Sequence, residues 1–145
     1  MENQLTIMNF SHVYENETFY KLYPYHWIEC SNMKGCNGYC DYSAIAALEK
    51  KLSVMKPEGI HFIDSGNYHY VSEIWMERIH TDFSLVVFDH HSDMRQPVFG
   101  DILSCGSWIM DALLHNKYLK KVILIGVSQE QEEAILDEST CLYLH

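Results

Sequence analysis

The sequence predicts an α/β protein with three layers, in which helices cover both faces of a mainly parallel sheet. The first observation is that strand-like and helix-like segments alternate along the chain, since crossover units that join parallel strands have this order. The second is that residues 83–88 (FSLVVF) and 121–127 (KVILIGV) are almost continuously apolar, as expected of central strands buried on both faces. We expect a single domain over residues 1–145.

Two strands and one helix are expected in the first half of the chain. Apolar residues recur at helical spacing over residues 44–55, and either Asp41 or Ser43 could cap the start of this helix. A Pro-Glu-Gly sequence at 57–59 then ends it. The other expected elements of this half are a strand at 5–10, a loop rich in Gly, Asn and Cys at 29–43, and a strand at 60–64.

Helices are expected before and after the apolar strand 83–88. Residues 69–79 place Val71, Ile74 and other apolar side chains on one helical face. Residues 107–116 are also helical in pattern and follow a loop that contains glycine. This strand is therefore expected between two crossover helices.

The strand 121–127 is followed by the start signal of a further helix. Ser128 with Gln131 three residues later forms a capping box, which predicts a helix at 129–136. In parallel α/β sheets, ligands bind outside the carboxyl ends of the strands. The residues that follow each strand are therefore the first place to look for a site.

Composition excludes several classes of partner. The net charge is −10, from 20 acidic and 10 basic residues, which argues against a nucleic-acid or anionic-membrane surface. No apolar run approaches the roughly 20 residues that cross a bilayer, and the N-terminal residues lack the pattern of a signal peptide. We expect a cytoplasmic protein that acts on a small molecule, and an unpaired sheet edge could allow a homo-oligomer.

The five cysteines indicate reduced thiols rather than disulfides. An odd number without a secretion signal is typical of a reducing compartment. Cys30, Cys36 and Cys40 are spaced by six and four residues, unlike the paired C-x-x-C of a zinc ribbon. We interpret them as incidental thiols of a loop.

Two strands end in residues that suit a metal ion. Asp89, His91 and Asp93 follow the strand 83–88, and residues two apart point to the same side of an extended chain. Unpaired carboxylates at the edge of a core are costly, and a divalent cation would compensate them; oxygen and imidazole ligands suit manganese, iron or zinc. His69, after the preceding strand, is a further candidate ligand. In a non-metal alternative, Asp89 caps the next turn and the histidines lie on the surface.

His69 followed by the "DHHSD" of residues 89–93 resembles the ureohydrolase family of arginases, agmatinases, formiminoglutamases and guanidinobutyrases. Those enzymes carry a GGDH element and then a DAHxD element at their strand ends, and the resemblance covers residues 59–127. It implies an arginase-like fold and a hydrolase with two Mn²⁺ ions that cleaves a linear C–N bond of a guanidino or amidine compound through a metal-bound hydroxide.

Carried over by residue, the resemblance assigns four ligands. His69 and Asp93 would bind the first ion, Asp89 would bridge both ions, and His91 would bind the second. His90 occupies the variable position of the motif and would point away from the metals. The family's remaining ligands come from a later S-x-D-x-D element, which does not occur before His145. We therefore expect partial or single-metal binding and little activity from this chain alone, unless Asp64 or Glu130 substitutes.

The sequence departs from the family at other positions. "GNYH" at 66–69 replaces GGDH. Cys105 lies near where the family has a catalytic histidine, and it could be a proton donor, a nucleophile or a small buried residue. Arg95 would bring positive charge near the pocket, which suits an acidic substrate rather than a cationic one.

Two other readings stay open. DHH-type manganese phosphoesterases also end a buried strand in Asp-His-His, and residues 36–48 loosely resemble the earlier acidic element that they need. The second alternative is a non-catalytic metal-binding or oligomerisation domain. Replacement of His90 separates the enzyme readings, since only the DHH-type site needs both adjacent histidines.

Overall fold

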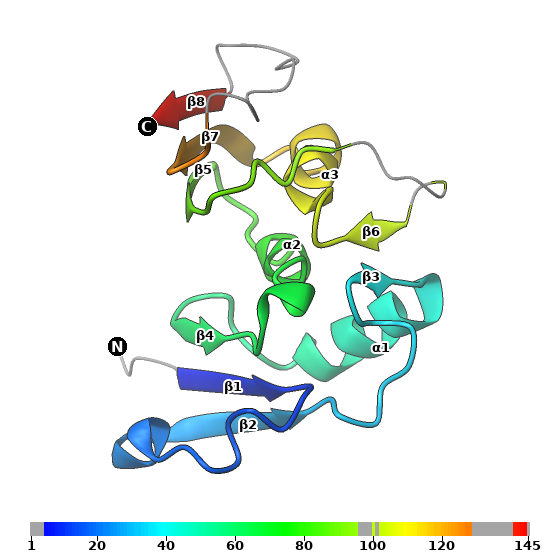
Figure 1. The fold of residues 1–145 in the computed structure, drawn as a ribbon, viewed down its shortest axis with the longest axis vertical. Coiled ribbons are helices and arrows are strands. Elements are labelled where there is room, and N and C mark those ends of the chain that lie inside the picture. Colours follow the sequence, from blue (N-terminus) through cyan, green and yellow to red (C-terminus); the bar gives the residue numbers. More distant parts are fainter. Residues whose placement is uncertain (1–4, 96–99, 101, 129–140, 145) are drawn as a thin grey trace.

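The computed structural model of the chain describes residues 5–95, 100, 102–128 and 141–144, and it is an α/β structure (Figure 1). Its parallel strands form two three-stranded sheets, in the orders β2-β1-β4 and β5-β7-β8. A third sheet pairs β3 and β6 in antiparallel. The strands are β1 (Leu5–Asn9), β2 (Tyr25–Glu29), β3 (Tyr39–Cys40), β4 (Ile60–Phe62), β5 (Phe83–Phe88), β6 (Leu103–Ser104), β7 (Leu119–Ile125) and β8 (Cys141–Leu144).

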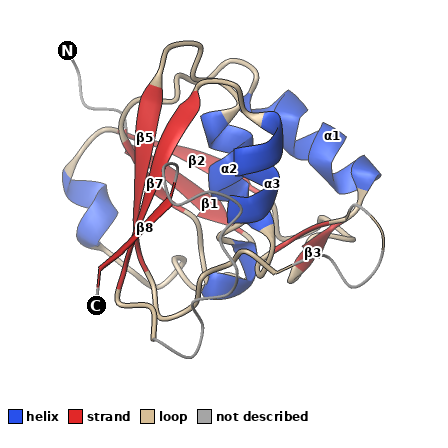
Figure 2. Cartoon of the chain, turned by 90° about the horizontal axis from the view of Figure 1, so that it is seen from above, coloured by secondary structure: helices blue, strands red, loops and turns tan. Residues whose placement is uncertain are grey.

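The described α-helices are α1 (Tyr42–Leu52), α2 (Val71–Met76) and α3 (Trp108–His115), and short 3-10 helices occur at Phe19–Leu22 and Gly66–Tyr68. In Figure 1, α2 lies between the sheet β2-β1-β4 and the sheet β5-β7-β8, and Figure 2 shows the three α-helices on one side of the sheet β5-β7-β8. The helix expected at 129–136 lies outside the described residues. A second helical layer therefore stays a prediction. None of the helices in the described part is long and apolar enough to cross a bilayer.

Of the two residues that could cap α1, Asp41 does so. Its Oδ1 accepts hydrogen bonds from the backbone N–H of Ala44 at 2.8 Å and from Oγ of Ser43 at 2.6 Å. A carboxylate at this position satisfies one of the N–H groups that the first helical turn leaves unpaired. Leu48 and Leu52 are fully buried on the inner face of the helix, so the apolar spacing in the sequence marks the face that packs on the core.

The expected strands at 5–10, 60–64, 83–88 and 121–127 are confirmed as β1, β4, β5 and β7. The expectation of a central strand at 83–88 is wrong for the described part of the chain, where β5 is the edge of its sheet and pairs only with β7. Its side chains alternate in exposure, and Val86 is 49% and Phe88 78% exposed. The expected single sheet is also divided, because β4 is only three residues long and pairs only with β1 in the described ladders.

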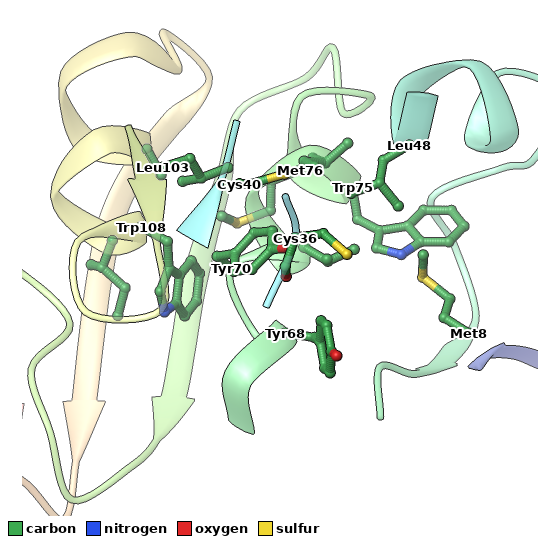
Figure 3. Packing of buried hydrophobic residues seen from close by; sticks show 14 of the residues in the cluster. Met8, Cys36, Cys40, Leu48, Tyr68, Tyr70, Trp75, Met76, Leu103 and Trp108 are labelled. Carbon is green, nitrogen blue, oxygen red and sulfur yellow. The ribbon is translucent and has the colours of Figure 1, made fainter. Parts of the chain in front are cut away.

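The core joins the helices to both parallel sheets (Figure 3). Tyr70 is fully buried at the start of α2, and its hydroxyl donates a hydrogen bond to the carbonyl of Cys36. Cys36 and Cys40 are buried beside it and reduced, and burial raises the pKa of the Cys40 thiol to about 11. Cys36 and Cys40 therefore pack as small apolar side chains.

Candidate metal centre

Three of the four predicted ligands converge in the structure. Ligand atoms of His69, Asp89 and Asp93 all lie within 4.8 Å of one another. His69 Nδ1 is 3.7 Å from Asp89 Oδ2, and His69 Nε2 is 3.4 Å from Asp93 Oδ2. The three residues come from the turn before α2 and from the loop after β5, which are twenty residues apart in sequence. We name these three residues the His-Asp-Asp triad.

Asp89 is placed by the sheet. Its backbone N–H donates to the carbonyl of Ile125 at 3.1 Å, which extends the pairing of β5 and β7 by one residue. Gly126 has a φ of +96°, and a Cβ atom there would lie 3.3 Å from the carbonyl oxygen of Asp89. The close approach of the two backbones thus depends on a glycine after β7.

His91 does not join the triad. The backbone N–H of His91 donates to Asp89 Oδ1 at 2.9 Å, so Asp89 caps a turn directly after the strand. The chain is no longer extended there, and the expected alternation of side chains is lost. The imidazole of His91 is 60% exposed, with Nδ1 3.5 Å from Asp89 Oδ1. The His90 side chain is also exposed, and its ring lies edge-on to that of His91.

Asp93 is the most buried member of the triad. Its side chain is 5% exposed, and its φ of +49° lies in the left-handed region that Asp tolerates better than most residues. Asp93 Oδ2 accepts a hydrogen bond from Trp108 Nε1 at 2.8 Å, and its carbonyl accepts one from the N–H of Ile109 at 3.1 Å. Burial raises the pKa of the Asp93 carboxyl, although the Trp108 hydrogen bond acts in the opposite direction.

His69 is oriented by a backbone carbonyl. Its Nε2 lies 2.7 Å from the carbonyl oxygen of Cys105, and because a carbonyl can only accept, Nε2 carries the hydrogen. The neutral ring then has its lone pair on Nδ1, the atom that faces Asp89 Oδ2. A hydrogen bond from the second ring nitrogen to a carbonyl is the usual support of a metal-binding histidine.

The triad fits a divalent cation. Two carboxylates and an imidazole offer the hard oxygen and borderline nitrogen donors that suit Mn²⁺, Fe²⁺ or Zn²⁺. The side chains of His69 and Asp89 are 30% and 25% exposed, so the group can be reached from solvent. Without a cation, a buried carboxyl at Asp93 beside a second carboxylate is unfavourable.

Cys105 and Arg95, the predicted catalytic and substrate-binding residues, make backbone rather than side-chain contacts near the triad. Cys105 meets His69 through its backbone carbonyl, and burial raises the pKa of its thiol, which favours the protonated form. The backbone N–H of Arg95 donates to the carbonyl of Gly106 at 3.0 Å, and the Arg95 side chain is exposed. Their expected roles as catalytic and substrate-binding residues stay predictions.

Asp64, the possible substitute ligand, stabilises a loop and is not part of the triad. Its carboxylate accepts hydrogen bonds from the N–H groups of Phe10, Ser11 and Ser65 at 2.8–2.9 Å, and from Ser11 Oγ at 2.6 Å. It thereby ties the end of β1 to the chain after β4. Glu130 lies outside the described residues.

The departures from GGDH also have packing partners. Asn67 Nδ2 donates to Asn37 Oδ1 at 2.9 Å, and the ring of Tyr68 stacks on Phe10 with 4.2 Å between centroids. Both contacts anchor the turn that carries His69. Trp108 was not among the candidates from the sequence, because a tryptophan at the start of a helix is normally a core residue, and only the fold brings its N–H to Asp93.

Comparisons with known proteins place the chain in no family. A scan against protein-family models finds no match, and no solved structure matches. The chain is 41% identical over 75 residues to an uncharacterized protein of Thermotoga maritima. The aligned segment covers 52% of this chain and 29% of that relative, so the chain spans less than a third of the relative's length.

Proposed function

We propose that the chain carries part of the site of a metal-dependent hydrolase of the ureohydrolase type, which acts on a linear C–N bond of a guanidino or amidine compound. The convergence of His69, Asp89 and Asp93 within 4.8 Å carries this proposal. These are three of the four residues to which the resemblance assigns metal ligation. Under the same proposal, the full fold is the arginase-like sheet with helices on both faces.

The triad would hold one Mn²⁺ ion. Such an ion supplies Lewis-acid activation of water near neutral pH. The residues of the chain have separate tasks in this site. Asp89 and Asp93 provide the negative charge. The Cys105 carbonyl keeps the proton of His69 on Nε2, so that the lone pair of Nδ1 can bind the ion. Arg95, two residues after Asp93, would favour an acidic group on the substrate.

A second candidate is a metal-binding domain without catalysis. The exposed position of His91 favours it, because the described residues then provide the ligands of one ion rather than two. A binuclear site would require His91 to leave its turn and further ligands to be supplied. Self-association of the chain is one source of such ligands, and β5, which is an edge strand among the described residues, would allow it.

Metal analysis followed by an activity screen tests the proposal. The purified chain is loaded with Mn²⁺, Fe²⁺ or Zn²⁺, the bound metal is measured, and urea or ammonia release is followed over guanidino and amidine compounds. We expect about one Mn²⁺ per chain, and we expect Asp89→Ala to lose it. The control is His90→Ala, which should keep the metal and any activity.

The outcomes separate the candidates. Metal binding without release of urea or ammonia from any compound supports the non-catalytic domain. Phosphoester hydrolysis that His90→Ala abolishes supports the DHH-type alternative. No bound metal, together with no change on Asp89→Ala, contradicts every metal-dependent function.

A further inference from the structure

We propose that Trp108 is a positioning residue of the metal site, which holds the Asp93 carboxylate in its ligating orientation through the indole N–H. This inference rests on the proposed metal-binding function. The hydrogen bond from Trp108 Nε1 to Asp93 Oδ2 is 2.8 Å long and buried. An indole N–H is a donor only, so it can hold a carboxylate oxygen without competing with it for a cation.

The position of Trp108 is itself fixed by the fold. Trp108 is the first residue of α3 and is 3% exposed (Figure 3). The next residue, Ile109, is fully buried, and its N–H donates to the carbonyl of Asp93. The start of α3 therefore makes two hydrogen bonds to Asp93, one to its side chain and one to its backbone.

Asp93 needs such support. It is buried in a left-handed backbone conformation, at φ +49° in a loop without regular secondary structure. A loop carboxylate without a fixed partner could turn away from His69 and Asp89. The Trp108 hydrogen bond fixes Oδ2, the carboxylate oxygen that lies 3.4 Å from His69 Nε2.

The same segment supports a second ligand. The carbonyl of Cys105, three residues before Trp108, accepts the hydrogen bond from His69 Nε2. The Trp108 ring also lies beside His69, with 6.0 Å between the ring centroids. Residues 105–109 thus support both His69 and Asp93. Among the described residues of this segment, the side chain of Trp108 alone makes a hydrogen bond to the triad.

The first test compares two buried tryptophans. Trp108→Phe removes the indole N–H and keeps an aromatic ring. Trp75→Phe is the matched control, because Trp75 is 4% exposed and its Nε1 has no hydrogen-bond partner in the described structure. We expect Trp108→Phe to raise the Mn²⁺ dissociation constant about 10–100-fold, as for other residues that hold metal ligands. Trp75→Phe should leave it unchanged, although both variants lose packing and melt at lower temperature.

The second test follows metal binding in the unsubstituted chain. The chain has three tryptophans, and its indole ¹H–¹⁵N resonances can be followed while diamagnetic Zn²⁺ is added. The Trp108 resonance, assigned by its loss in Trp108→Phe, should shift with saturation of the site, and the Trp75 resonance, assigned by its loss in Trp75→Phe, should not.

The results distinguish this inference from the proposed function. If the unsubstituted chain binds neither Mn²⁺ nor Zn²⁺, the metal site and the role of Trp108 both fail. If it binds metal, but the Trp108 resonance stays in place or Trp108→Phe binds as tightly as Trp75→Phe, only the positioning role is overturned.

Discussion

The backbone N–H of His91 donates a 2.9 Å hydrogen bond to Asp89 Oδ1, and this bond turns the chain at the end of β5. Asp89 therefore has two tasks, because Oδ1 caps the turn while Oδ2 faces His69 Nδ1 at 3.7 Å. The turn directs the His91 imidazole toward solvent. A motif that would bring three side chains to one side of an extended chain brings only Asp89 and Asp93 to the triad here.

This relationship predicts unequal effects of two histidine substitutions on metal binding. His69→Ala should weaken Mn²⁺ binding at least about tenfold, since it removes a triad member. His91→Ala should leave the dissociation constant nearly unchanged, because its ring lies outside the triad. Both constants can be measured by electron paramagnetic resonance of free Mn²⁺. Two bound ions, one of them lost in His91→Ala, would contradict the single-ion triad.

Gly126→Ala should destabilise the fold by about 1–2 kcal/mol, because the residue has a φ of +96° and its new Cβ would press on the carbonyl of Asp89. Gly106→Ala is the matched control, since nothing lies within 4 Å of a Cβ built there. Urea unfolding measures both. Equal stability of the two variants would show that the contact between Gly126 and Asp89 does not constrain the strand ends.

Asp41→Ala should cost about 0.5–2 kcal/mol through loss of the cap of α1. Asp41 Oδ1 accepts from the Ala44 N–H at 2.8 Å, and alanine leaves that group to solvent. Asp41→Asn keeps an acceptor in the same place and should recover most of the stability. Thermal unfolding followed by circular dichroism compares the three proteins, and a loss as large in Asp41→Asn would mean that the charge, rather than the cap, stabilises the helix.

Glu73→Gln should stabilise the protein above neutral pH. The Glu73 side chain is 4% exposed and its Oε2 has no hydrogen-bond partner in the described part. Burial, with smaller contributions from Asp111 and Glu77, raises the pKa of this carboxyl to about 10. The folded chain thus keeps a proton that the unfolded chain releases above about pH 4.3.

The sign of the pH effect follows from this difference. Between the unfolded and folded pKa values, stability falls as pH rises, by up to about 1.4 kcal/mol per pH unit from this group. Glutamine has no proton to lose, so its advantage should be small near pH 4 and should grow toward pH 8. Denaturant unfolding across this range measures the difference, and a constant difference would contradict the buried neutral carboxyl.

The grouping of His69, Asp89 and Asp93 was partly predictable from the sequence. His69, Asp89 and Asp93 were candidates because each follows an apolar strand of an expected parallel sheet. They lie together in the structure even though β4 and β5 belong to different sheets. The position of His91 was not predictable, because it depends on whether Asp89 caps a turn or the chain stays extended. Trp108 was not predictable either, since its hydrogen bond to Asp93 joins segments fifteen residues apart.

Local sequence patterns were enough to locate the three α-helices and the strands β1, β4, β5 and β7, but not β2 (Tyr25–Glu29). Residues 83–88 match β5, and residues 107–116 contain α3, because apolar periodicity and capping residues act within a few positions of the chain. The pairing of the strands, in contrast, follows from the tertiary fold. The fold placed β5 at an edge, divided the parallel strands into two sheets and formed the short antiparallel pair of β3 and β6. Strand pairing depends on contacts between segments that are distant in sequence, and local patterns do not indicate which segment covers an apolar face.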